Sequence, residues 1–193
     1  MNKTLELNNA FKNGDYKVVL DKAHAILSEE PENWDAIYLV ASVKSMPLPD
    51  FYDPDTAVAL VAAAIEKNSE HETRWLALAE IQTSCGRYGD ASDTYKRILL
   101  NWPNSYQGMI GLALLYGHPQ IKQTHVESRQ FLERAIATAP DRGEAYYYLG
   151  HQKKMMGEIS AAIPLFEHSL TLFIEQGSSM QTVVEEVLRS IRK

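Results

Sequence analysis

The residues of this sequence that could carry chemistry are its histidines, its single cysteine and a run of three tyrosines. His118 and His125 fall in one loop, without the i, i+4 spacing of a helical metal site and without a neighbouring carboxylate cluster. Cys85 precedes Gly86 at the end of a predicted helix, where the helix dipole disfavours a thiolate. We therefore expect no metal site, no cofactor and an unreactive cysteine.

Catalytic and phosphate-binding motifs are missing from the sequence. It contains no G-x-S-x-G, P-loop, G-x-G-x-x-G, H-E-x-x-H or EF-hand pattern, which argues against an enzyme. The formal net charge is -6 and no cluster of Lys and Arg overrides it, so a nucleic-acid partner is not expected. A single cysteine excludes an intrachain disulfide.

No apolar run approaches the roughly 18 to 20 residues that span a bilayer. The beginning of the sequence, MNKTLELNNAF, lacks the apolar core of a secretory signal. These features predict a soluble, cytoplasmic protein. A periplasmic location is the alternative, if the chain derives from a membrane-anchored protein.

Proline and glycine recur at regular distances along the chain. Pro31, Pro103 and Pro140 each end an apolar helical pattern. Gly14, Gly86 and Gly157 each separate two such patterns, and they stand 72 and 71 positions apart. Each distance is about two repeat units of 34 residues with a few residues inserted. The sequence therefore predicts stacked helical hairpins.

The apolar positions follow the same repeat. The second helix of each predicted hairpin carries apolar or small residues at i, i+4 and i+7, and three of the five sets follow the order small, large, small: Val19, Ala23, Ile26; Ala57, Val61, Ala64; Ala91, Tyr95, Ile98; Ser128, Leu132, Ala135; Ala162, Phe166, Ser169. The first helices carry large, large, small residues: Ile37, Val40, Ala41; Trp75, Leu78, Ala79; Met109, Leu112, Ala113; Tyr146, Leu149, Gly150. Each set forms one stripe on its helix, and small residues let paired helices approach closely.

With these residues the sequence resembles the tetratricopeptide repeat (TPR) family over about nine-tenths of its length. The third unit carries signature residues at Trp75, Leu78, Ala79, Gly86, Tyr88, Ala91, Tyr95, Ile98 and Pro103. The fifth unit matches through Leu149, Gly150, Gly157, Ala162 and Phe166. The resemblance implies an all-α, right-handed α-solenoid of about five hairpins.

We place the five units at residues 1–33, 34–71, 72–105, 106–142 and 143–176, followed by a C-terminal capping helix at 178–192. Long loops are expected at 45–55 and 117–128. Pro164 is expected to bend the second helix of the fifth unit. In unit one, Lys3 and Glu6 replace apolar residues, so Leu5, Leu7 and Phe11 should be poorly covered. The alternative role for the last helix is detachable partner binding.

In the TPR family the first helices line a concave surface. Carrying the inward positions over selects a partner-binding groove formed by Tyr38, Leu39, Ser42, Leu76, Ala77, Glu80, Thr83, Gln107, Ile110, Gly111, Leu114, Glu144, Tyr147, Tyr148, His151 and Lys154. The middle of this set is apolar and rich in tyrosine, and contiguous exposed apolar surface usually marks a binding site. The resemblance therefore implies a scaffold or adaptor that binds a protein or peptide. The alternative is that a loop or the last helix fills the groove.

Two sub-classes of the family can be compared with the sequence. The carboxylate clamp of chaperone-binding relatives would need Lys, Asn and Arg at Thr4, Asn8, Leu39, Thr73 and Ala77, and only Asn8 fits. The layout of residues 72–190 is similar to haem-lyase-associated subunits of cytochrome c maturation, which implies binding of an apocytochrome tail. A third alternative is a self-assembling structural repeat that forms a homo-oligomer, for which poorly covered residues of unit one would provide the contact.

Overall fold

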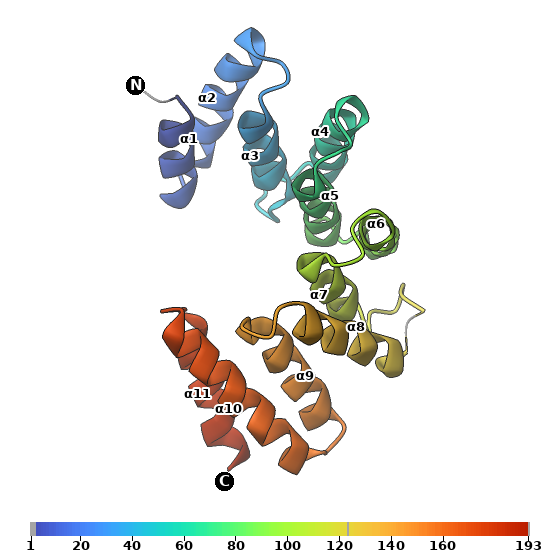
Figure 1. The fold of residues 1–193 in the computed structure, drawn as a ribbon. Coiled ribbons are helices and arrows are strands. Elements are labelled where there is room, and N and C mark those ends of the chain that lie inside the picture. Colours follow the sequence, from blue (N-terminus) through green and yellow to red (C-terminus); the bar gives the residue numbers. More distant parts are fainter. Residues whose placement is uncertain (1–2, 123, 193) are drawn as a thin grey trace. The chain divides into compact units, whose positions relative to one another are not determined.

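Every regular element in residues 3–122 and 124–192, the part that this computed structural model describes, is an α-helix (Figure 1). The helices are α1 (Lys3–Lys12), α2 (Tyr16–Glu29), α3 (Trp34–Ser45), α4 (Pro54–Lys67), α5 (Glu72–Ser84), α6 (Tyr88–Asn101), α7 (Tyr106–Leu114), α8 (His125–Thr138), α9 (Gly143–Met155), α10 (Ile159–Glu175) and α11 (Met180–Ile191). The start of predicted unit 1–33 and one position of predicted loop 117–128 lie outside the described residues. Within the described residues, no helix is long and apolar enough to cross a membrane.

The chain forms two compact units, which are described separately. Unit 1 extends to Thr94 and unit 2 begins at Tyr95, so the boundary falls inside α6. The predicted all-helical hairpin fold is confirmed. Each of the five predicted repeats contains two of the observed helices, but the division at residues 33, 71, 105, 142 and 176 stays a prediction.

Glycine ends the first helix of three hairpins in the same way. Gly14, Gly86 and Gly157 have φ angles of 80°, 73° and 77°, in the left-handed region that favours glycine. At Gly14 the amide donates to the carbonyl of Phe11, and the next amide, of Asp15, donates to the carbonyl of Ala10, both at 3.0 Å. The same pair of bonds recurs after Gly86 and Gly157. These Schellman motifs explain why glycine stands at each of these turns.

Several helices begin at a side chain that accepts a backbone N–H. Asn33 caps α3 through the amide of Ala36 at 3.1 Å, and Ser105 caps α7 through the amide of Gly108 at 3.0 Å. Asp53 caps α4, whose first residue is Pro54. Thr124 and Glu127 form a reciprocal capping box at α8. Asparagine, serine, aspartate and threonine therefore fix where the helices begin.

The first hairpin is better covered than its sequence predicts. Leu7 of α1 is completely buried and Ala10 nearly so, whereas Leu5 is 59% exposed. Lys3 forms an ion pair with Glu29 at 2.6 Å and Glu6 forms one with Lys22, both between α1 and α2. The expectation of poor cover is wrong for Leu7, because its face of α1 packs into the core of unit 1.

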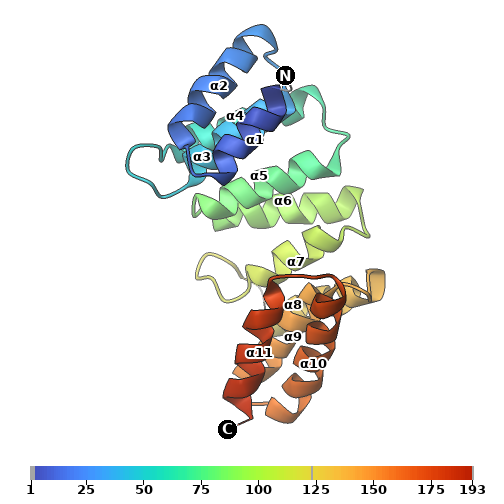
Figure 2. The same cartoon turned by 90° about the vertical axis from the view of Figure 1, so that its left-hand side faces the viewer.

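The connection between α3 and α4 is the predicted long loop, although it is shorter than expected. It occupies residues 46–53, because Ser45 ends α3 and Pro54 begins α4. Figure 2 shows it projecting beyond the ends of both helices. The amide of Asp53 donates to the carbonyl of Lys44 at 2.8 Å, and their side chains form an ion pair at 3.1 Å. These contacts close the base of the loop.

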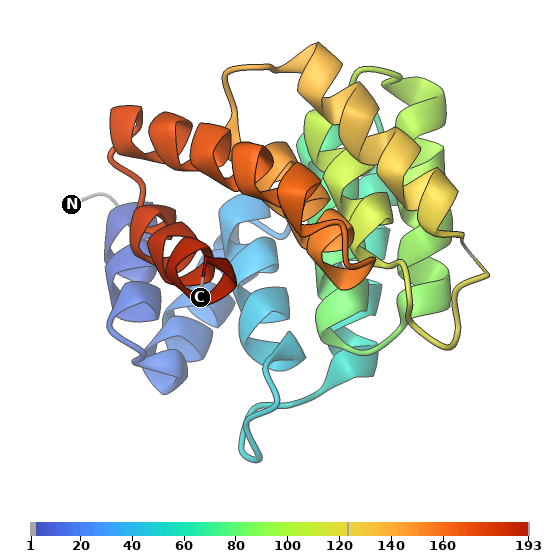
Figure 3. The same cartoon turned by 90° about the horizontal axis from the view of Figure 1, so that it is seen from below.

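In unit 2, helix α11 packs along α10 (Figure 3). Its Val184 and Leu188 are buried against a cluster that includes Phe166 and Phe173. At the start of α11 the amide of Met180 donates to Ser178 Oγ at 3.3 Å, whereas Ser179 makes no side-chain cap. These two residues attach α11 to α10, and the role of α11 as a fixed cap stays a prediction.

Helices α6 and α7 approach each other closely where a glycine faces a tyrosine. A Cβ atom added to Gly111 would lie 2.2 Å from Cζ of Tyr95, which is buried. A Cβ on Gly89 of α6 would meet nothing within 4 Å. The two glycines therefore differ in what a methyl group would contact.

We expect Gly111→Ala to destabilise the protein by about 1–3 kcal/mol, because the methyl group overpacks against the Tyr95 ring. Gly89→Ala should instead leave the free energy of unfolding unchanged or raise it by up to about 1 kcal/mol, because alanine favours helix. Urea unfolding followed by circular dichroism measures both. Equal stability of the two variants would contradict this account of the α6–α7 contact.

Candidate functional site

In unit 1, three residues of the predicted groove line a cavity of about 440 Å³. They are Tyr38 and Ser42 of α3 and Glu80 of α5. Phe11 of α1 also lines the cavity, so the first helices of three hairpins contribute to it. Helix α3 packs against both α1 and α5. The first helices of successive hairpins therefore share one hollow in unit 1.

The cavity contains residues that the inward-position rule did not select. These are Phe11, Ser45, Met46, Pro47, Ile81 and Ser84. Met46 and Pro47 come from the loop after α3, which lies outside the helical repeat. Only the unusual length of that loop signalled a contribution of this kind in the sequence.

Tyr38 belongs to a short aromatic stack. Its ring lies 6.0 Å from that of Trp34, with an interplanar angle of 22°. The guanidinium of Arg74 lies over the Trp34 ring, 5.1 Å from its centroid. Ser42 donates its hydroxyl to the Tyr38 carbonyl at 2.8 Å, a side-chain-to-backbone hydrogen bond within α3.

Glu80 supplies the negative charge of the cavity. It forms no ion pair with any residue in the described part of the chain. Its side chain stays exposed, yet surrounding protein atoms partly desolvate the carboxylate and raise the pKa of Glu80 above its ordinary value. A cation placed beside Glu80 would relieve this cost.

Several predicted groove residues are buried in the helix packing. Leu39, Ser42, Ala77 and Ile110 are only 4%, 9%, 6% and 6% exposed. The expected exposure of Ile110 in an apolar trough is therefore wrong, since it packs in the core of unit 2 with Met109 and Leu132. Of the others in unit 1, Leu76 and Thr83 are half-buried.

In unit 2 the predicted residues fall into an exposed and a packed set. Gln107 and Leu114 are exposed, and Leu114 keeps 51% of its surface. Glu144 is already engaged, because it accepts a hydrogen bond from the Tyr106 hydroxyl at 3.2 Å and pairs with Arg142 at 3.3 Å. Burial raises the pKa of the Tyr106 phenol, which keeps it a hydrogen-bond donor.

The tyrosine run divides between packing roles. Tyr147 makes edge contacts with His151 and Phe166, with ring centroids 4.5 Å and 6.0 Å away. Tyr148 packs against the other cluster, which contains Ile110. Tyr146 lies edge-on to His168 at 4.4 Å. All three tyrosines are half-buried, so they form the wall of unit 2 rather than an open aromatic cage.

The surroundings of His151 disfavour its protonated form. Burial lowers the pKa of its imidazole, and the Lys154 charge lowers it further. Its Nε2 atom is buried and has no hydrogen-bond partner among the described residues. Protonation would therefore place a charged N–H in an apolar contact with Phe166.

No three His, Cys, Asp or Glu side chains come together as a metal-binding group in the described residues. Cys85 is partly buried, and its Sγ lies 3.9 Å from the Pro54 carbonyl oxygen. Burial raises the pKa of the Cys85 thiol and so disfavours the reactive thiolate.

We predict that stability falls as the pH is lowered from about 7.5 to about 5.5, through the ordinary imidazole range. The lowered folded-state pKa of His151 means that the unfolded chain binds the proton first, so acid favours unfolding. His151→Phe should flatten this slope, because it removes the group whose pKa is lowered in the folded state. Melting curves across this pH range test it, and identical slopes for wild type and His151→Phe would refute it.

Comparison with known proteins relates the chain to solved structures. No protein-family profile and no curated protein matches the sequence. TTC0263, a thermophilic TPR protein from Thermus thermophilus, is 15% identical, with 98% of this chain and 97% of that one covered and a TM-score of 0.72. Yeast Tom70 is 19% identical with a TM-score of 0.77, and the match covers 98% of this chain and 39% of Tom70.

MamA from Desulfovibrio magneticus RS-1 is 15% identical, with 92% of this chain and 99% of that one covered and a TM-score of 0.63. At such low identity these matches establish the fold and leave the partner undefined. Together with the glycine-ended hairpins and the largely buried stripes of the second helices, they identify the chain as having the fold of the tetratricopeptide repeat family.

Proposed function

We propose that the protein is an interaction module that binds a segment of a partner protein in the cavity formed by α1, α3 and α5. The observation that carries this proposal is the hollow of about 440 Å³ that Tyr38, Ser42 and Glu80 line. It combines apolar walls with a carboxylate that forms no ion pair among the described residues. Such a combination of apolar surface and a few polar groups is typical of a ligand site.

The chemistry of the cavity defines the segment that it fits. Phe11, Met46, Pro47 and Ile81 offer apolar and aromatic surface to an inserted side chain. Glu80 offers a charge-assisted hydrogen bond to a lysine or arginine next to it. We therefore expect a segment with a large apolar residue flanked by a basic residue.

The size of the cavity is consistent with moderate affinity. Burial of a few hundred Å² of apolar surface at roughly 25 cal/mol/Å² stabilises a complex by several kcal/mol before ordering costs. The net result corresponds to a dissociation constant on the order of micromolar. In unit 2, exposed Gln107 and Leu114 and half-buried Lys154 are the residues of the predicted set best placed to add contacts.

Two alternatives lead to different partners. The first alternative is self-assembly through the first repeat, residues 1–33. Of its three residues predicted to be poorly covered, Leu5 is exposed, whereas Leu7 is fully buried and Phe11 packs partly against the core. Binding of an apocytochrome tail rests on the long connection between α7 and α8 and on α11, and it stays a prediction. Light scattering at micromolar concentration addresses the first, and titration with an apocytochrome C-terminal peptide addresses the second.

Selection of peptides from a random phage-displayed library tests the proposal, because such a library samples many combinations of apolar and charged residues. The wild-type protein should enrich sequences that pair a large apolar residue with Lys or Arg. Glu80→Lys should weaken binding of a selected peptide by about tenfold or more, because an attractive charge becomes repulsive. Titration calorimetry with the selected peptide measures the change.

Glu66→Lys is the matched control, because it makes the same charge change at an exposed position of α4 that does not line this cavity. Both substitutions lie on the surface and should leave the melting temperature near that of wild type. Equal binding by the Glu80→Lys and Glu66→Lys variants would reject this cavity as the partner site. Tyr147→Glu is a poor probe, because the ring packs on Phe166 and its loss would also destabilise unit 2.

A further inference from the structure

A second cavity of unit 1 is formed mainly by the second helices of two successive hairpins. It has a volume of about 340 Å³, and most of its lining residues come from α2, α4 and the segments that follow them. Its apolar surface includes Leu27 of α2, Ile37 of α3 and Leu60 of α4. This volume is at the small end of the roughly 300–1,000 Å³ of ligand cavities.

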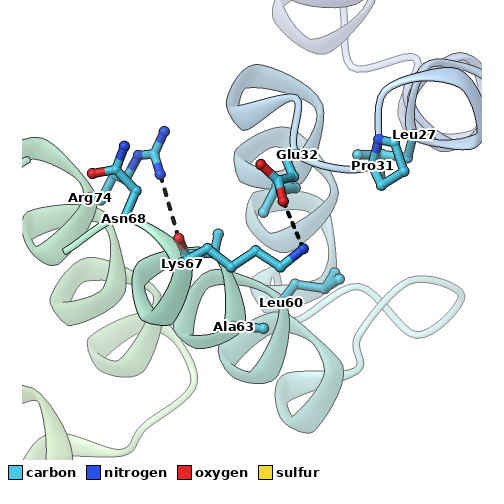
Figure 4. Close-up of a pocket in the computed structure, with 10 residues that line it drawn as sticks. Leu27, Pro31, Glu32, Leu60, Ala63, Lys67, Asn68 and Arg74 are labelled. Atoms are coloured by element: carbon cyan, nitrogen blue, oxygen red, sulfur yellow. Dashed lines mark hydrogen bonds and ion pairs between the residues drawn. The ribbon is translucent and has the colours of Figure 1, made fainter.

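Two polar side chains, those of Asn68 and Arg74, lie at one end of this cavity. In Figure 4, Arg74 and Asn68 lie close together, and Leu27 and Pro31 lie at the opposite end. Between the two ends, Lys67 reaches across to Glu32, and their charged atoms are 2.9 Å apart. The cavity is therefore amphipathic along its length.

Arg74 is the uncompensated charge of this cavity. Within the described residues it forms no ion pair with a carboxylate, and its guanidinium donates a long hydrogen bond, of 3.4 Å, to the Ala64 carbonyl. The guanidinium is oriented by stacking over the Trp34 ring at 5.1 Å. An arginine carries five N–H donors in a planar fork, so most of them remain for an anion.

We propose that this cavity binds a monocarboxylate with an aliphatic chain of medium length. The carboxylate accepts hydrogen bonds from Arg74 and the Asn68 amide, and the chain lies along Leu60 and Ile37 toward Leu27. A guanidinium matches a carboxylate with two parallel hydrogen bonds. The apolar end gains from burial of methylene groups.

Other ligand classes match the cavity less well. A cation would face Arg74, and a neutral chain would desolvate the guanidinium without giving it a partner. The Lys67–Glu32 pair does not block entry, because both side chains are more than half exposed, at 61% and 72%. An exposed pair of this kind contributes little to stability, so it opens at small cost.

Titration calorimetry of the full chain with sodium butanoate, hexanoate and octanoate, and with 1-octanol, tests the proposal. Affinity should rise by about fourfold for each added methylene group until the cavity is filled. Octanol has the same chain without the charge, and it should bind at least tenfold more weakly than octanoate. Amide shifts in nitrogen-15 spectra should map octanoate to Leu60, Asn68 and Arg74.

Two variants locate the site. Arg74→Gln should weaken octanoate binding by about tenfold, and Ala63→Phe should block it by filling the cavity. Arg87→Gln is the matched control, because it removes an arginine of unit 1 that pairs with Asp55 outside the cavity. Circular dichroism verifies folding.

Absence of octanoate binding to wild type, equal binding of octanol, or unchanged affinity in Arg74→Gln would each overturn the proposal. So would amide shifts confined to residues that do not line this cavity. Glu80 does not line this cavity, so the Glu80→Lys variant should lose peptide binding and still bind octanoate. The two proposals can therefore fail separately.

Discussion

The close approach of paired helices is the constraint on which the rest of the structure depends. Small side chains stand where helices cross: Ala23, Ala41, Ala57 and Ala79 in unit 1 are completely buried. In unit 2, Gly150 is so close to the Phe166 ring that an added Cβ would lie 3.0 Å from it. Larger residues at these places would push the hairpins apart, because packed interiors tolerate little added volume. These crossings place the first helices of unit 1 around one cavity, and α2 and α4 around the other.

Much of the fold could be predicted because its signals are local and periodic. Gly14 determines the backbone only at its own turn, where φ is positive. The prolines of the loop at residues 46–53 likewise affect only the residues next to them. Stripes such as Ser128, Leu132 and Ala135 repeat every turn, and all three residues are buried. The cover of Leu7 could not be predicted in this way, because it depends on the contact of α1 with later helices.

The candidate site was predictable only in part. Inward repeat positions led to Tyr38, Ser42 and Glu80, but the same rule selected Leu39 and Ile110, which the neighbouring helices bury. A position within a repeat defines a direction from the helix axis, whereas exposure depends on the size of the side chains packed next to it. Contacts between residues far apart in sequence, such as Lys67 with Glu32 across the second cavity, leave no periodic signal.

The central claim is that the inner surface of α1, α3 and α5 holds a partner segment with an apolar and a basic residue. Nitrogen-15 spectra of the full chain, titrated with a peptide of this type selected on the wild-type protein, test it most directly. The account predicts that the largest amide shifts occur at Phe11, Tyr38, Ser42 and Glu80, which line the cavity. Shifts confined to α2 and α4, or to unit 2, would contradict it.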